Sequence, residues 1–280
     1  MYLDKNITVN GVSIRYQDTG GSGLPILMTH GMGGSLEFWN QQLKTADVQV
    51  RMIAWDMPGH GLSDMGNQPY DVDKFAEFAC QFIQALGLQR LVLVGNSLGG
   101  AVSIRVADKL AERIVGIVMV GAAALGRDCI VPFRLMTLPV LGNLMSKAST
   151  AGIERQITAI FLNSNVATEE VRKIIHRNVF KPKGDKAFLA TLRSMTNLSG
   201  QSPTTFERTL NILRKVRSPT LFIHGEQDAV VPASHSRDAQ TITPNAKLLV
   251  IAGCGHTPQM EKPVEFNLAL SKFITPLLNP

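Results

Sequence analysis

Residues Leu91 to Ala101 read LVLVGNSLGGA. The first four are apolar and include two valines, a composition typical of a buried parallel strand. The next five, GNSLG, match the pattern Gly-x-Ser-x-Gly, which between a strand and a helix places the serine on a sharp, strained turn. Such a turn needs small residues two positions before and after the serine, as at Gly95 and Gly99. The following helix would point its free N–H groups toward the reaction centre, so the segment predicts that Ser97 is a nucleophile.

Strand and helix patterns alternate on both sides of this segment. Asn10-Gly11 separates two stretches of alternating polarity and predicts a hairpin of residues 7–9 and 12–18. Short apolar runs predict further strands at 26–30, 50–55, 114–121, 219–225 and 247–252. Helical spacing is found at 35–43, 72–86, 98–111 and after Pro263. This alternation predicts a mostly parallel sheet with right-handed crossovers.

The alternation stops between residues 125 and 216. This segment contains no convincing strand, only helical patterns at 153–162, 169–178 and 186–198 with prolines between them. It is too long for an ordinary crossover, and its Met, Phe and Leu residues predict an apolar underside. We therefore expect a core domain formed by 1–124 and 217–280, and a helical cap formed by 125–216.

Composition and charge narrow the class of protein. With 280 residues, 45% of them apolar, the chain can bury a full core. The net charge of +6 is unevenly distributed, because residues 125–217 hold 15 Lys/Arg against 6 Asp/Glu and the rest holds 13 against 16. No zinc-finger spacing, glycine-aromatic motif or run of basic residues accompanies this excess, which argues against nucleic-acid binding. We expect either a solvated surface or a cap that favours acidic, carboxylate-bearing substrates.

The sequence shows no targeting segment and no sign of a metal site. No apolar run reaches the roughly 18 residues that span a bilayer, and the first residues lack the layout of a signal peptide. We therefore expect a cytoplasmic protein with no membrane span. Three widely spaced cysteines, Cys80, Cys129 and Cys254, suggest neither a disulfide framework nor a zinc site.

A base and an acid for Ser97 follow two late strands. An unassisted serine hydroxyl is a poor nucleophile, so it needs a base in hydrogen-bond reach and a carboxylate that orients the base. Asp228 follows the strand at 219–225, and His256 follows the strand at 247–252. Both loops would emerge at the same carboxyl edge of the sheet as Ser97. Glu226 is the competitor for the acid, but its place directly after His224-Gly225 is that of a loop residue.

Other titratable residues have simpler interpretations. Asp56 ends a strand and precedes Pro and Gly, so we expect it to stabilise a turn. His30 and His224 end strands and are expected to satisfy local backbone groups. His176 and His235 lie in helical patterns and are expected to be exposed.

Five motifs in this order resemble those of α/β-hydrolase-fold serine hydrolases across nearly the whole chain. They are His30 to Gly34, Asp56 to Ser63, Gly95 to Gly100, His224 to Asp228, and Gly255 to Pro263. The resemblance implies a mostly parallel eight-stranded sheet with helices on both faces and a helical cap inserted after the sixth strand. It also implies the triad Ser97, Asp228 and His256, an oxyanion hole made by the backbone N–H groups of Met32 and Leu98, a small-molecule ester as substrate, and neither metal nor organic cofactor. The pocket residues expected on the same basis are Gly31, Asn96, Phe161, Met136, Val230 and Thr257.

The branch within this family is less sharply indicated. Ser97 argues against the haloalkane dehalogenases and epoxide hydrolases, which have aspartate at that position. Asn96 resembles the meta-cleavage-product hydrolases, which cut carbon–carbon bonds in dienoic keto acids, but these usually have Trp where this chain has Thr257. The ending from His256 to Pro263 is shared by carboxylesterases, lactonases and perhydrolases. We expect a carboxylesterase, with carbon–carbon hydrolysis, lactone or perhydrolase chemistry, and a non-catalytic ligand receptor as alternatives.

Overall fold

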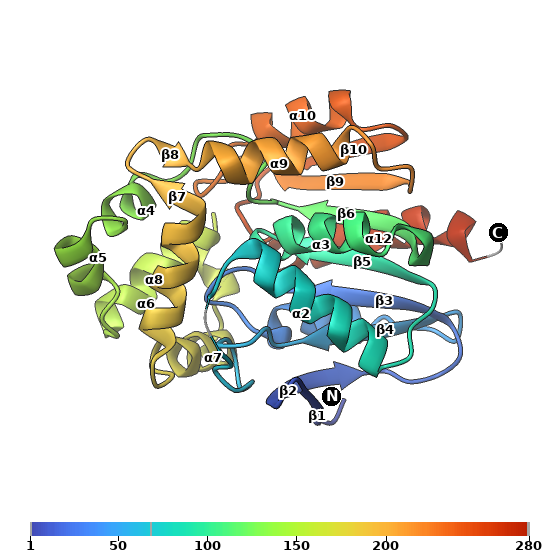
Figure 1. Cartoon of the computed structure of the whole chain (residues 1–280), viewed down its shortest axis with the longest axis horizontal. Helices are drawn as coiled ribbons and strands as arrows, with labels where there is room; N and C mark the ends of the chain where they lie inside the picture. Colours follow the sequence, from blue (N-terminus) through green and yellow to red (C-terminus); the bar gives the residue numbers. More distant parts are fainter. Residues whose placement is uncertain (1, 68, 279–280) are drawn as a thin grey trace.

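An eight-stranded sheet forms the centre of the computed structural model, which describes residues 2–67 and 69–278 (Figure 1). The strands are β1 (Lys5–Val9), β2 (Val12–Asp18), β3 (Leu24–Thr29), β4 (Val50–Trp55), β5 (Leu91–Asn96), β6 (Ile114–Val120), β9 (Thr220–Gly225) and β10 (Ala246–Ile251). Their order is β1-β2-β4-β3-β5-β6-β9-β10. The β1–β2 and β2–β4 pairs are antiparallel and the other five are parallel. The predicted mostly parallel eight-stranded sheet is confirmed.

Strand β5 lies between β3 and β6, and all six of its residues are buried. Because side chains alternate across a strand, Leu91 and Leu93 pack on one face of the sheet and Val92 and Val94 on the other.

The helices on the sheet are η1 (Leu36–Trp39), α1 (Asn40–Leu43), α2 (Val72–Ala85), α3 (Leu98–Lys109), η2 (Ala111–Arg113), α9 (Pro203–Leu213), α10 (Ala233–Ile242), α11 (Pro258–Glu261), α12 (Pro263–Ile274) and η4 (Thr275–Leu277). The face with Leu91 and Leu93 is covered by α2, α3, α9 and α10, and the face with Val92 and Val94 by η1, α1 and α12.

The chain between β6 and α9 forms a group of helices beyond the carboxyl ends of the parallel strands (Figure 1). We refer to residues 125–202, the part of the predicted 125–216 segment that precedes α9, as the cap. Its helices are α4 (Val131–Met136), α5 (Pro139–Met145), α6 (Thr150–Ile160), η3 (Ser164–Val166), α7 (Glu169–Val179) and α8 (Gly184–Met195). It also contains a hairpin of two-residue strands, β7 (Thr196–Asn197) and β8 (Gly200–Gln201), that the sequence pattern did not predict. Helix α9 contacts α3 and α10 and so lies in the layer on the sheet. No helix in the ranges 2–67 and 69–278 is long and apolar enough to cross a membrane.

A buried ion-pair network joins cap helix α7 to the core. Arg177 donates from Nη1 and Nη2 to the two carboxylate oxygens of Glu37, at 2.7 and 3.0 Å. On the core side, Arg15 Nη2 lies 2.8 Å from Glu37 and its Nη1 lies 3.1 Å from Asp56. Burial alone would raise the pKa of Glu37, but hydrogen bonds from Arg177 and Arg15 outweigh it and hold the pKa well below its ordinary value of 4.5.

Replacing Glu37 with glutamine should destabilise the protein at pH 7 by about 2–4 kcal/mol, because two partly or fully buried guanidinium groups lose a shared counter-charge. A carboxylate whose pKa is depressed on folding stabilises the fold above its unfolded pKa and loses that effect as the pH falls. Urea unfolding at several pH values should therefore show the difference from the wild type narrowing below about pH 4.5. The matched control is Glu77→Gln, which removes the exposed partner of Lys74 and should change stability little. Equal losses in both variants would contradict this role for the network.

Candidate active site

Ser97 occupies the turn between β5 and α3 with φ +54° and ψ −116°, a conformation that an L-residue rarely adopts. Two flanking glycines make this turn possible. A Cβ on Gly95 would lie 2.2 Å from the carbonyl oxygen of Gly99, and a Cβ on Gly99 would lie 2.2 Å from that of Thr29. The small residues expected on either side of Ser97 are therefore required by close backbone approach on both sides of the turn.

The loop after β3 lies beside this turn. A hydrogen bond of 3.0 Å from Gly34 N to Gly31 O closes it, and Gly33 has φ +73°. The ring of His30 fixes the start of this loop. Its Nδ1–H donates to Gly31 O at 2.7 Å, and its Nε2 accepts from Met57 N at 3.1 Å. Burial lowers the pKa of His30 to about 4, in keeping with a neutral ring that both donates and accepts. The expectation that His30 satisfies local backbone groups is confirmed.

Two backbone N–H groups beside the Ser97 turn, those of Met32 and Leu98, make no hydrogen bond to a described protein group. Leu98 is the first residue of α3, where an N–H group has no partner within the helix. Neither its N–H nor that of Met32 donates to a protein acceptor among the described residues. The helix start adds the positive end of its dipole. This pair of unused donors beside Ser97 is suited to an oxyanion.

His256 and Asp228 form a hydrogen-bonded pair from the loops after β10 and β9. The distance from His256 Nδ1 to Asp228 Oδ2 is 2.7 Å. Because an ionised carboxylate only accepts, Nδ1 carries the proton and Nε2 is the unprotonated nitrogen. Both Ser97 and His256 line the same cavity. Glu226 is exposed, and its carboxylate accepts from Gln227 at 3.1 Å.

Asp228 has four hydrogen-bond donors. The backbone N–H groups of Val230 and Val231 donate to Oδ1 at 2.8 and 3.1 Å, and the two histidines share Oδ2. Burial alone would raise the pKa of Asp228, but the electrostatic interaction with His256 and hydrogen bonds from His224 and His256 hold it well below its ordinary value of 3.8. The carboxylate is therefore ionised and fixed in orientation.

His224 is the contributor to this group that sequence patterns missed. Its Nε2 lies 3.0 Å from Asp228 Oδ2 and 3.2 Å from the carbonyl oxygen of Val231, both acceptors, so Nε2 carries the proton. Its Nδ1 then accepts from the Ser236 hydroxyl at 2.7 Å. The expected backbone contact exists, and the contact with Asp228 adds a second histidine donor to the acid. The strand-to-loop position gave no signal for this, because the pairing depends on how the loop folds back over β9.

The side chain of Asn96 supports the His256 loop. Its Nδ2 donates to the carbonyl oxygen of His256 at 3.1 Å and to that of Val120 at 3.0 Å. From the other side, the carbonyl oxygen of Ile160, at the end of α6, accepts from His256 N at 3.0 Å and from the Thr257 hydroxyl at 3.2 Å. The loop is thus fixed by β5, β6 and the cap together.

A cavity of about 440 Å³ lies between the cap and the carboxyl edge of the sheet. Its lining is mainly apolar, with Phe38, Ile130, Phe133, Met136, Phe188 and Val230 among the contributors. Gln156 from α6 adds a polar group: its Nε2 lies 3.6 Å from where a Cβ on Gly33 would be. The volume and lining suit a small or medium-sized organic ligand.

Most of the expected site residues meet at this cavity. Lining it are Gly31, Met32, Met136, Asn96, Ser97, Val230, His256 and Thr257. Phe161 is different: it is buried in a cluster between the cap and η1, with Phe38, Ile153, Ile157 and Ile175, and is not among the described lining residues. The expectation for Phe161 is corrected, because a helical pattern does not tell which apolar face packs inward within the cap.

The remaining candidates have structural surroundings. Asp56 accepts from the backbone N–H groups of Leu36 and Leu62 at 2.7 and 2.8 Å, which confirms its turn-stabilising role. His176 is exposed as expected. The expectation for His235 was wrong: it is buried at the start of α10, facing Gly126. Within the ranges 2–67 and 69–278, no group of three His, Cys, Asp or Glu side chains is arranged to hold a metal ion.

Comparisons with known proteins agree with this geometry. A model of the alpha/beta hydrolase fold family matches residues 25–263. The chain is 28% identical over 269 residues to the dihydrolipoyllysine-residue acetyltransferase component of an acetoin cleaving system from Pseudomonas putida, covering 95% of this chain and 68% of that protein. It is 28% identical over 272 residues to a 2-hydroxy-6-oxo-6-phenylhexa-2,4-dienoate hydrolase from Comamonas testosteroni, covering 93% and 91%.

Solved structures give the same result. A crystal structure of a putative aryl esterase from Burkholderia cenocepacia is 28% identical, with a TM-score of 0.80 and coverage of 99% of this chain and 100% of that one. The family model spans most of the chain and includes the Ser97 turn and both loops that carry Asp228 and His256. The chain therefore belongs to the α/β-hydrolase-fold family of hydrolases.

Proposed function

We propose that this hydrolase is a serine carboxylesterase that acts through an acyl-enzyme on Ser97. The observation that carries the proposal is the His256–Asp228 hydrogen bond of 2.7 Å on a cavity that Ser97 also lines. An ionised, four-fold hydrogen-bonded Asp228 keeps the proton of His256 on Nδ1, which makes Nε2 the base. The strained turn at Ser97 is further support, because backbone strain of this kind is concentrated at functional sites.

In the first half-reaction, Ser97 Oγ attacks the ester carbonyl carbon while its proton passes to His256 Nε2. The negative charge that develops on the carbonyl oxygen is stabilised by the backbone N–H groups of Met32 and Leu98, each of which contributes about 3 kcal/mol in comparable sites. The tetrahedral intermediate collapses as the bond to the alkoxy oxygen breaks. His256 gives its proton to that oxygen, so an alcohol leaves and an acyl ester remains on Ser97.

In the second half-reaction, water replaces the alcohol. His256 Nε2 accepts a proton from the water as its oxygen attacks the acyl carbon, and the same two N–H groups stabilise the second oxyanion. Collapse breaks the bond to Ser97 Oγ, which recovers its proton from His256. The carboxylic acid is released and the enzyme returns to its initial protonation state.

The structural role of Asn96 removes the sequence-based argument for carbon–carbon over ester hydrolysis. Asn96 is the residue that resembles the meta-cleavage-product hydrolases, but its amide nitrogen is engaged by two backbone carbonyls that hold the His256 loop. A residue with this structural task is compatible with any reaction of the triad. The shared triad also allows lactone and perhydrolase chemistry, so substrate preference has to be measured.

A substrate panel tests this choice. Purified protein is assayed with p-nitrophenyl esters of increasing acyl length, a lactone and a dienoic keto acid. We expect kcat/KM for at least one ester to exceed that for the keto acid by about tenfold or more, a difference in transition-state stabilisation of about 1.4 kcal/mol. A larger kcat/KM for the keto acid would instead identify a carbon–carbon hydrolase. No turnover of any member would favour a non-catalytic ligand receptor.

A further inference from the structure

Helices α4 and α5 have apolar residues on both of their faces. On the inner side, Phe133, Met136 and Met145 line the cavity. On the outer side, three side chains are largely exposed: Val131 at 60%, Val140 at 74% and Leu144 at 58%. Leu135 and Leu138, from the same two helices and their junction, are exposed as well. A surface helix normally places polar residues on its outer face, so this pair of helices departs from the usual amphipathic pattern.

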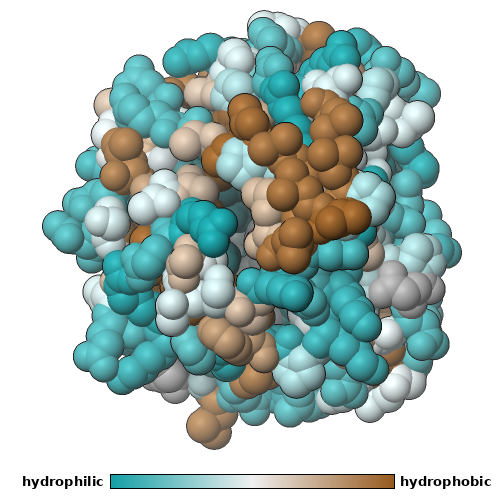
Figure 2. All heavy atoms as spheres, turned by 90° about the vertical axis from the view of Figure 1, so that its left-hand side faces the viewer, coloured by the Kyte–Doolittle hydropathy of each residue, from teal (hydrophilic) through white to brown (hydrophobic). Residues whose placement is uncertain are grey.

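The exposed side chains come from two helices that pack against each other, α4 and α5, and from the junction between them. Figure 2 views the molecule from the side that is on the left in Figure 1, and hydrophobic residues form a contiguous patch on this face. We call the side chains of Val131, Leu135, Leu138, Val140 and Leu144 the cap patch. Contiguous apolar patches on soluble proteins mark surfaces that contact a protein or a membrane.

The cavity reaches the surface next to the cap patch. Lys147, two residues after the end of α5, and Arg155, on α6, both line the cavity and are both exposed. If an apolar phase contacts the cap patch, a molecule that leaves this phase therefore has only a short path to the apolar cavity. Leu144 in the patch and Met145 in the lining are consecutive residues of α5, about 100° apart around the helix axis, so the two surfaces adjoin on one helix.

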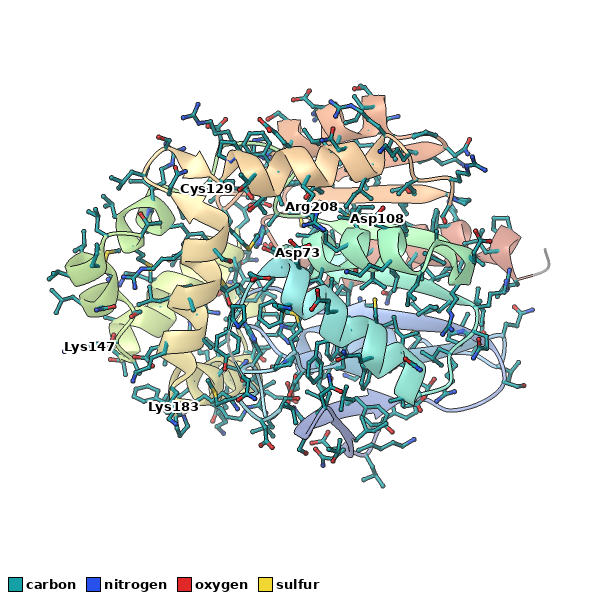
Figure 3. All side chains as sticks on the ribbon, viewed as in Figure 1. Asp73, Asp108, Cys129, Lys147, Lys183 and Arg208 are labelled. Carbon is teal, nitrogen blue, oxygen red and sulfur yellow. The ribbon has the colours of Figure 1, made fainter. Side chains whose placement is uncertain are left out.

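The positive charge of the cap favours an anionic partner over a second copy of the chain. Residues 125–202 contain 11 Lys/Arg and 5 Asp/Glu, a net +6, while the rest of the chain contains 17 of each. The whole net charge of the protein thus lies in the cap. Figure 3 shows Lys147 and Lys183 on the cap, and both side chains are exposed. A second copy docked on the cap patch would bring two basic caps together, whereas an anionic lipid surface attracts basic groups around an apolar contact.

We propose that the cap patch docks on an anionic lipid surface. The apolar side chains of α4 and α5 enter the interfacial region, and exposed basic side chains of the cap such as Lys147 and Arg155 contact lipid headgroups. Docking turns the cavity toward the lipid, so that apolar esters pass from the lipid into the site. This surface is separate from the triad, so docking is measured independently of catalysis.

The test is co-sedimentation of Ser97→Ala protein with vesicles of equal parts phosphatidylglycerol and phosphatidylcholine. The Ser97→Ala background prevents hydrolysis of the lipid during the measurement. Adding Val140→Ser and Leu144→Ser should weaken vesicle binding by about tenfold or more, because several buried methyl and methylene groups are lost. The matched control adds Val48→Ser and Leu268→Ser, a Val and a Leu exposed at 93% and 55% on the core. The control should bind like the parent.

Each outcome decides the proposal. Binding that falls with the cap substitutions, falls with added salt and is weaker on pure phosphatidylcholine supports it. Absence of vesicle binding by the parent overturns it, and so does equal binding by the cap and control variants. Sedimentation velocity is run on the same proteins without lipid. A dimer that the cap substitutions convert to a monomer would assign the patch to a second copy of the chain, which also overturns the proposal.

Discussion

Replacing Ser97 with alanine should lower kcat for ester hydrolysis by a factor on the order of 10⁵, because no acyl-enzyme can form. The remaining activity would come from water attack assisted by the oxyanion donors and by substrate binding. The variant keeps the cavity and both N–H groups, so KM should change far less than kcat. Steady-state kinetics with the best ester of the substrate panel measures both parameters.

Ser103 supplies a matched control for this experiment. It lies in α3, six residues after Ser97, and its buried Oγ has no hydrogen-bond partner among the described residues. Ser103→Ala removes the same atom from the same helix region without touching the cavity, and kcat should be unchanged. If Ser97→Ala retains more than a tenth of the wild-type kcat, Ser97 is not the nucleophile.

Replacing Asp228 with asparagine should lower kcat by about 10⁴, the size of effect seen when the acid of such a triad loses its charge but keeps its shape. Two backbone N–H groups donate to Oδ1, so the amide oxygen of the asparagine would occupy that position. Its NH₂ group would then face His256 and His224, which now both point N–H groups at it. His256 would have to accept at Nδ1 and carry its proton on Nε2, where it cannot act as a base.

Glu226→Gln is the control for the loss of charge. Glu226 lies two residues away in the same loop, is exposed and makes no contact with His256 in the described structure. Its replacement removes one negative charge at nearly the same place in the sequence, and kcat should stay within about twofold of the wild type. Comparable losses in both variants would show that the net charge of the loop, and not the orientation of His256, controls activity.

The fold could be predicted from the sequence because its signals are local. A buried parallel strand is a short run of apolar residues, and β5 has that pattern in the sequence and is buried at every position. Turn residues such as Asn10 and Gly11 act over a few bonds, and both have the positive φ that a tight hairpin requires. The order of strands and loops then placed Ser97, Asp228 and His256 at one edge of the sheet.

The structure of the cap and the surroundings of the triad could not be predicted in the same way. Phe161 lies in a helical pattern that has apolar residues on more than one side, and only packing decides that it faces the cluster between the cap and η1. His235 is buried because the loop containing Gly126 passes over α10. His224 reaches Asp228 because the loop between them turns back over the strand end. These contacts depend on how the loops pack. The periodicity of apolar residues along the sequence gives no information about that packing.

The role of Ser97 as the nucleophile is tested most directly by identifying the residue to which a covalent inhibitor attaches. Protein treated with a fluorophosphonate probe is digested, and the modified peptide is identified by mass spectrometry. We expect one adduct, on the Oγ of Ser97, that is absent in Ser97→Ala and formed far more slowly in Asp228→Asn. An adduct on another residue, or labelling that persists in Ser97→Ala, would contradict this role.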